Sequence, residues 1–187
     1  MEVIKNGNEV VLYFGIGLIG DTTLRLNLKE ENFVWKRSVP FPWHNTSMQN
    51  LALDCIIEDV LLAQKVQVIW SAGNGNLMST KDDFIVGEQA LQRVITFLQY
   101  ECVESEVVIH YLSSAGALHY GQNYIDYDSA VITDNAYACS KSIEEKLLEN
   151  FVTHSLNKIL YIYRPSTVYG YVKNKRFGLI TKLLFDV

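Results

Sequence analysis

Short apolar runs alternate with longer amphipathic segments along this chain of 187 residues. The runs are rich in β-branched and aromatic residues, which favour strands, and they occupy residues 10–14, 66–70, 107–112 and 158–163. Apolar residues at helical spacing separate them, most clearly at residues 81–100 and in the segment that begins at Tyr137. Strands that alternate with helices predict an α/β fold with a parallel sheet.

Weaker patterns complete the predicted order of elements. Helices are expected at residues 22–32, 51–64 and 177–187, and a second strand is expected at residues 33–36. The stretch at residues 38–50 contains two prolines and is interpreted as irregular, with room for a short third strand. Residues 113–134 are interpreted as a loop.

Composition and charge argue against several classes of partner. The net charge of −5 at pH 7 provides no basic surface for nucleic acid. No apolar run reaches the roughly 18 residues that a membrane helix needs, and the N-terminal residues lack a signal-peptide pattern. Cys55, Cys102 and Cys139 are odd in number and widely spaced, so neither a disulfide framework nor a zinc site is expected. We therefore expect a cytoplasmic protein without a metal site.

A glycine-rich turn follows the first of these strands. Gly15, Gly17 and Gly20, with Leu18 and Ile19 between the last two, form the pattern G-x-G-x-x-G just before a helix. Glycines permit a tight turn and let the backbone approach a pyrophosphate, while the helix N-terminus contributes free N–H groups. The order of strand, turn and helix therefore predicts a dinucleotide-binding site. A turn that serves only packing is the alternative.

The residues beyond this turn bear on which dinucleotide binds. An acidic residue about 20 positions beyond the glycines usually holds the ribose hydroxyls of NAD. Residues 35–38 offer no carboxylate there, but they include Lys36 and Arg37. A guanidinium suits a 2′-phosphate by its bidentate geometry, so Arg37 slightly favours NADP over NAD. The alternative is that both side chains are only solvated charges. Asp21, next to the turn, would repel a bound phosphate unless it points outward.

Tyr137 and Lys141 are four residues apart in a helical pattern, which places a phenol and an ammonium on one helix face. The ammonium is expected to stabilise the phenolate and lower the pKa of the phenol, so that the tyrosine acts as an acid or base toward a substrate hydroxyl. Tyr171 and Lys175 have the same spacing, but they lie in a polar stretch. The acidic residues that follow Lys141 are interpreted as part of a solvated helix face.

Four features together resemble the extended short-chain dehydrogenase/reductase family, the group of NAD(P)-dependent nucleotide-sugar epimerases and dehydratases. They are the glycine turn, the sequence LSSAGALHYG at residues 112–121, the Tyr137–Lys141 pair, and the sequence YRPSTVYG at residues 163–170. The resemblance covers nearly the whole chain. It implies a Rossmann-type doubly wound parallel sheet with helices on both faces.

The resemblance also implies roles for particular residues. Tyr137 is the general acid/base, Lys141 holds the nicotinamide ribose, and Ser114 forms a hydrogen bond to the substrate oxygen, with Ser113 as the second candidate. Further cofactor contacts are implied for residues that follow two of the strands, namely Ala72, Gly73, Arg164 and Pro165. The implied substrate is a nucleotide-sugar.

Departures from the family pattern restrict the implied reaction. Ala115 and Gly116 follow Ser114 where dehydratases have an acidic pair, which leaves epimerisation or reduction of a keto-sugar. The family's proteins continue well beyond the Val-Tyr-Gly sequence. We therefore expect an NAD(P)-binding domain at residues 1–170 and the start of an incomplete substrate-binding lobe at residues 171–187. A dinucleotide-binding protein without a complete substrate site is the alternative. Homodimers are possible through the predicted helices near residues 81–100 and 140–151.

Overall fold

The computed structural model describes residues 1–29, 35–73, 78–126, 128–153, 155–166 and 168. Its six strands form one sheet in the order β3-β1-β2-β4-β5-β6. Their bounds are Glu2–Asn6 for β1, Glu9–Phe14 for β2, Trp35–Ser38 for β3, Lys65–Trp70 for β4, Glu106–Leu112 for β5 and Lys158–Tyr163 for β6. Strands β2, β4, β5 and β6 are parallel, which confirms the predicted α/β sheet.

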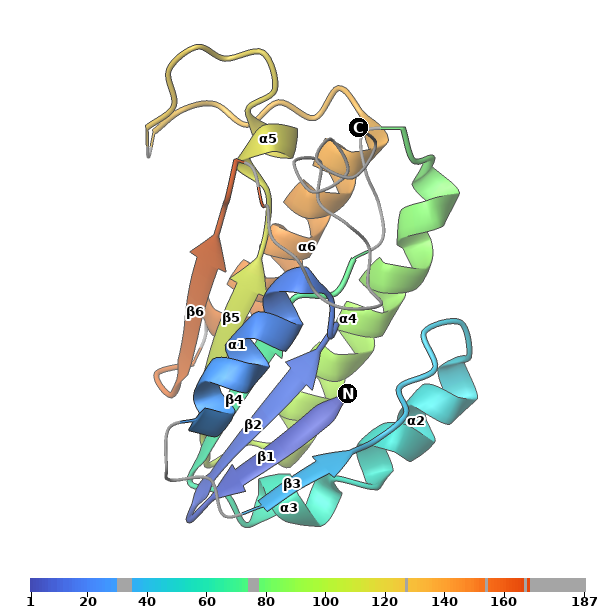
Figure 1. The fold of residues 1–187 in the computed structure, drawn as a ribbon, viewed down its shortest axis with the longest axis vertical. Helices are drawn as coiled ribbons and strands as arrows, with labels where there is room; N and C mark the ends of the chain where they lie inside the picture. Colours follow the sequence, from blue (N-terminus) through green and yellow to red (C-terminus); the bar gives the residue numbers. More distant parts are fainter. Residues whose placement is uncertain (30–34, 74–77, 127, 154, 167, 169–187) are drawn as a thin grey trace, which may run out of the picture.

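Helices cover both faces of this sheet (Figure 1). Their bounds are Leu18–Lys29 for α1, Thr46–Asp54 for α2, Ile57–Leu61 for α3, Lys81–Glu101 for α4, Ala115–Leu118 for α5 and Ala136–Thr153 for α6. Leu24 of α1 packs on Ile4, Val11 and Tyr13 on one face, whereas α2, α3, α4 and α6 contribute to the larger core on the other. The doubly wound arrangement is therefore confirmed.

The N-terminal strand β1 was not predicted. It runs antiparallel to β2 with Glu2 opposite Tyr13, and Gly7 makes the connecting turn with a φ of 55°. Such a positive φ suits glycine, and an Asn-Gly dipeptide between strand-like residues is a hairpin signal. Because β1 occupies the place beside β2, the strand that follows α1 pairs with β1 instead of with β2. Strand β3 therefore lies one strand farther from the glycine turn.

Two other expectations changed at the boundaries. The predicted helix at residues 51–64 is two helices, of which α2 begins earlier because the Asn45 side chain accepts a hydrogen bond from the Met48 N–H. The described part of residues 38–50 contains no strand beyond Ser38. The predicted helix at residues 177–187 lies outside the described residues, as does all of the predicted lobe at 171–187.

Aromatic side chains fill the core at the carboxyl ends of β2 and β4. Phe14 contacts Trp70 and Phe41, each with ring centroids 5.1 Å apart. Trp43 contacts Trp70 at 5.8 Å. These contacts hold the segment after β3 against the carboxyl edge of the parallel strands.

No helix in the described part of the chain is long and apolar enough to cross a membrane.

Core packing between α4 and the sheet can be tested with two leucines. Leu98 of α4 is fully buried, whereas Leu62 is 74% exposed. We expect Leu98→Ala to lower the free energy of unfolding by about 2–5 kcal/mol, because it leaves a cavity in the main core. Leu62→Ala, the matched control, should change it by less than about 0.5 kcal/mol. Urea denaturation followed by circular dichroism measures both, and equal effects would contradict the packing of α4.

Candidate functional site

A cavity of about 580 Å³ opens at the carboxyl edge of the parallel strands. Ligands of open α/β sheets bind at this edge. Its walls come from the turn after β2, the segments after β3, β4 and β5, the first half of α4, and α6. The lining includes Gly15, Ile16, Gly17, Leu18, Ile19, Trp43, His44, Trp70, Ser71, Ala72, Gly73, Phe84, Ser113, Tyr137, Lys141 and Glu144.

The glycine turn packs tightly against the segment after β4. Gly15 has a φ of +86°, and a Cβ at this position would lie 2.4 Å from the Cα of Ala72. A Cβ at Gly20 would lie 2.2 Å from the Gly15 carbonyl oxygen. Ser71 completes the contact, since its hydroxyl donates to the same carbonyl at 2.7 Å. Glycine is therefore required at both positions by the packing of the turn.

Gly17 differs from these two glycines because a Cβ on it would meet no described atom within 4 Å. It lines the cavity and directly precedes α1, whose first N–H groups have no partner within the helix. This is the geometry that lets a backbone approach a diphosphate. Asp21 does not line the cavity, and its carboxylate forms an ion pair with Arg25 at 2.8 Å.

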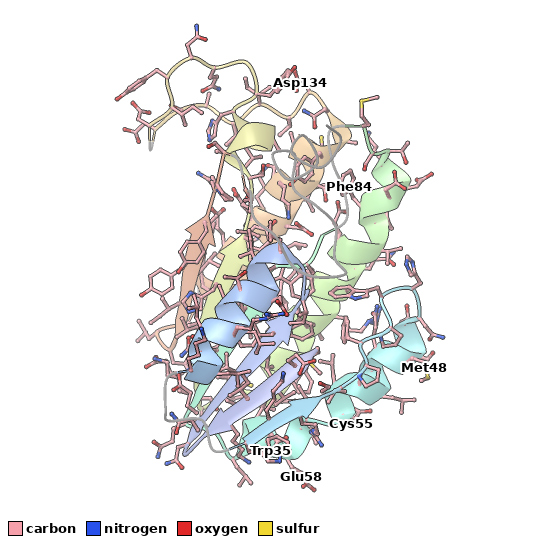
Figure 2. The ribbon with its side chains drawn as sticks, in the orientation of Figure 1. Trp35, Met48, Cys55, Glu58, Phe84 and Asp134 are labelled. Carbon is pink, nitrogen blue, oxygen red and sulfur yellow. The ribbon has the colours of Figure 1, made fainter. Side chains whose placement is uncertain are left out.

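Tyr137 and Lys141 both line the cavity from the first turns of α6. Asn135 starts this helix by accepting a hydrogen bond from the Ala138 N–H at 2.8 Å. The Tyr137 ring stacks on Phe84 of α4 with ring centroids 5.7 Å apart, and Phe84 is labelled in Figure 2. A Cβ on Gly73 would lie 3.9 Å from Lys141 Nζ. The two predicted motifs, glycine turn and tyrosine–lysine pair, therefore face one cavity.

Lys141 is buried, and protein groups surround its ammonium. It donates to Glu144 Oε2 at 2.9 Å, to the Tyr111 hydroxyl at 3.2 Å and to the Leu112 carbonyl oxygen at 3.3 Å. Tyr111 in turn donates to Glu144 Oε2. Burial, and next the Glu144 carboxylate, raise the pKa of Tyr111 far above its usual value, so this side chain remains a neutral phenol.

The interpretation of the acidic residues after Lys141 as a solvated face was therefore wrong for two of them. Glu144 and Glu145 are both buried. Their positions gave a signal that the sequence analysis missed, because Glu144 shares the i, i+4, i+7 stripe of Leu148 and Phe151, which are core residues. Trp43 and His44 also line the cavity, and the sequence did not assign them to the site.

Of the two serines after β5, Ser113 lines the cavity and Ser114 does not. The Ser114 hydroxyl accepts a hydrogen bond from the Ala117 N–H at 3.1 Å, which caps α5, and Ser114 does not line the cavity. Ser113 lines the cavity and is 4% exposed. Its hydroxyl has no hydrogen-bond partner among the described residues. A buried hydroxyl without a partner is unfavourable. The placement therefore favours Ser113, the second candidate, over Ser114.

Arg37 does not face the cavity. Its guanidinium donates to the Cys55 carbonyl oxygen at 2.6 Å and to Asp59 at 3.0 Å, and it lies over the Trp35 ring. Trp35 and Cys55 are at the end of the molecule remote from Phe84 (Figure 2). The insertion of β1 causes this separation. Arg37 consequently provides no geometric argument for NADP over NAD.

The other predicted cofactor contacts divide into two groups. Leu18, Ile19, Ala72 and Gly73 line the cavity. Arg164 and Pro165 do not: Arg164 donates to both carboxylate oxygens of Glu145, at 2.9 and 2.7 Å, and the Pro165 carbonyl accepts from the Ala115 N–H. These two residues anchor the segment after β6.

Gly20 and Gly17 provide a matched pair for testing the turn. We expect Gly20→Ala to lower the free energy of unfolding by about 1–3 kcal/mol, because its methyl group would overlap the Gly15 carbonyl. Gly17→Ala should change it by less than about 1 kcal/mol, since its Cβ meets open space. Urea denaturation measures both values. A Gly20→Ala variant as stable as Gly17→Ala would contradict the turn geometry.

No protein-family model and no curated protein sequence matches this chain. Solved structures do. The chain is similar to the dTDP-4-dehydrorhamnose reductase from Yersinia enterocolitica, with a TM-score of 0.68 and 16% identity over 96% of this chain and 60% of that one. For the UDP-glucuronic acid 4-epimerase from Bacillus cereus, in complex with NAD, the TM-score is 0.63, with 16% identity over 95% of this chain and 63% of that one.

RMD from Pseudomonas aeruginosa, complexed with NADPH, is similar with a TM-score of 0.62 and 20% identity over 91% of this chain and 57% of that one. The chain thus spans about three fifths of the length of these proteins. At this level of identity the likeness concerns the fold. The chain has the same fold as these solved structures, which confirms the Rossmann-type fold that the family resemblance implied.

Proposed function

We propose that this chain binds a nicotinamide dinucleotide, NAD or NADP, and is an epimerase or keto-reductase for a nucleotide-sugar. The observation that carries the proposal is that one cavity contains both the open glycine position before α1 and the Tyr137–Lys141 pair on α6. Among the similar solved structures, the UDP-glucuronic acid 4-epimerase is in complex with NAD and RMD is complexed with NADPH. The names of that epimerase and of the dTDP-4-dehydrorhamnose reductase describe enzymes of nucleotide-linked sugars.

The residues present fit such a cofactor. Gly17 leaves space for a diphosphate at the N-terminus of α1, where helix N–H groups and the helix dipole favour an anion. Ala72 and Gly73 extend the same wall toward Lys141, which would hold the nicotinamide ribose. Trp43 and His44 line the cavity on the side of the segment after β3 and would contact the adenosine half.

The bound nicotinamide supplies the hydride chemistry, and the protein supplies position and proton transfer. Tyr137 moves the proton at the substrate hydroxyl or carbonyl oxygen. Ser113 donates a hydrogen bond to the same oxygen, in the role that the family resemblance implied for Ser114. Lys141 orients the ribose through its ammonium, whose charge Glu144 balances.

One observation favours the alternative of a dinucleotide-binding protein without catalysis. Three protein acceptors surround the Lys141 ammonium, so it must exchange or share one of them to contact a ribose hydroxyl. In that alternative the cofactor binds, but no keto-sugar is turned over.

Cofactor binding is tested by calorimetric titration with NADH and NADPH. We expect Gly17→Val to weaken binding at least about tenfold, because its side chain would occupy the space of the diphosphate. Arg37→Ala is the matched control, and it should change the affinity for NADPH by less than about twofold because Arg37 is engaged with Asp59. A large loss of NADPH affinity in Arg37→Ala would restore the original prediction for this residue.

Catalysis is tested by following reduced nicotinamide absorbance with nucleotide-linked 4-keto-sugars. Net loss of the reduced form indicates a reductase, whereas sugar interconversion without net loss indicates an epimerase. We expect Tyr137→Phe to lower kcat by about 10²–10⁴-fold while cofactor affinity is retained. Ser113→Ala should lower kcat more than Ser114→Ala does. Undiminished turnover in Tyr137→Phe would refute the assigned acid/base, and absence of turnover in the wild type with intact cofactor binding would support the alternative.

A further inference from the structure

Glu144 is a buried carboxylate that faces the cavity from α6 and has no part in the chemistry proposed above. It lies one helical turn after Lys141, and the two side chains form an ion pair at 2.9 Å in which each is 8% exposed. Removing two charges from water is costly unless they are paired and hydrogen-bonded. The pairing therefore explains how the ammonium is tolerated in this position.

Lys141, Glu144 and Tyr111 form a closed triangle of hydrogen bonds. The ammonium donates to both other side chains, and the Tyr111 hydroxyl donates to the carboxylate oxygen that already accepts from Lys141. Tyr111 is neutral because burial raises its pKa. The triangle thus holds the lysine in one position, and the charges of its members cancel.

The neighbouring charged groups do not replace Glu144 in this role. Glu145 is buried next to it, but its carboxylate is bound by both nitrogens of Arg164. Asp83 also lines the cavity, and its carboxylate accepts hydrogen bonds from the Thr80 N–H and hydroxyl at the start of α4. Among the residues that the structure describes, Glu144 supplies the carboxylate that contacts Lys141.

We propose that Glu144 is a positioning residue that holds Lys141 and cancels its charge beside the nicotinamide. The inference rests on the proposed function. The oxidised nicotinamide ring is a cation, whereas the reduced ring is neutral. An unpaired ammonium at this end of the cavity would disfavour the oxidised form, and the Lys141–Glu144 pair removes that bias.

The test is a calorimetric titration of the full chain with NAD⁺ and with NADH at one pH and salt concentration. The quantity measured is the ratio of the Kd for NAD⁺ to the Kd for NADH. We expect Glu144→Gln to raise this ratio about tenfold, because the unpaired Lys141 ammonium would repel the cationic ring of NAD⁺. A repulsion of this size is typical of two unit charges several ångströms apart in a partly hydrated site. Glu145→Gln, a buried control on the same helix, should change it by less than about twofold. If Glu144 had only a structural role, Glu144→Gln would weaken the binding of NAD⁺ and of NADH equally.

Two further variants keep the result decisive. The double variant Lys141→Met with Glu144→Gln removes both charges and should return the ratio to within about twofold of the wild type. If Glu144→Gln does not fold, Lys141→Met leaves the carboxylate without its partner and should lower the ratio. An unchanged ratio in the folded single variants would overturn the role of Glu144 while cofactor binding stands. Failure of the wild type to bind either form would overturn the proposed function as well.

Discussion

The close contact between the glycine turn and the segment after β4 determines how the cavity is built. Gly15 and Gly20 have no space for a side chain, because the backbone of Ala72 and the hydroxyl of Ser71 lie against them. This contact holds the N-terminus of α1 at the sheet edge where β4 and β5 also end. Since α6 reaches the same edge from the opposite face of the sheet, two segments more than a hundred residues apart meet around one space.

Helix α6 buries charged side chains near its start and apolar side chains near its end. A helix on a sheet normally buries an apolar stripe, yet α6 buries Lys141, Glu144 and Glu145 in its first half. Each charge has a partner of opposite sign, which is the condition under which buried charges are tolerated. Leu148 and Phe151 in the second half pack into the main core and hold the helix in place. The end of α6 that lines the cavity is therefore positioned by its apolar end.

The fold was predictable from the sequence to the extent that each element carried its own pattern. Strong apolar runs identified β2, β4, β5 and β6, and the glycine spacing placed the turn correctly beside the sheet edge. Strand β1 was not predicted because the N-terminal residues are largely polar, although Asn6 and Gly7 give a hairpin signal. Strand order depends on contacts between distant segments, which local patterns do not encode.

The site was predictable where a motif fixes local geometry and not where tertiary contacts decide it. Tyr137 and Lys141 face the cavity because helical spacing puts them on one face. The choice between Ser113 and Ser114 depends on which hydroxyl caps α5, and this short helix was not predicted. The burial of Glu144 depends on Tyr111 from strand β5. Pairings of this kind are decided by the assembled core.

The β1–β2 hairpin changes which residues can determine the preference for NAD or NADP in such a sheet. The preference for NAD or NADP is usually predicted from a residue at the end of the second strand in the chain, because that strand ordinarily lies beside the first. Here the antiparallel strand β1 lies between β2 and β3, and the side chains of Trp43 and His44 line the cavity instead. In the proposed complex, a loop would therefore contact the adenosine half in place of a strand end. Discrimination between NAD and NADP in such a sheet depends on the residues that lie next to the cofactor in space, whatever their position in the sequence.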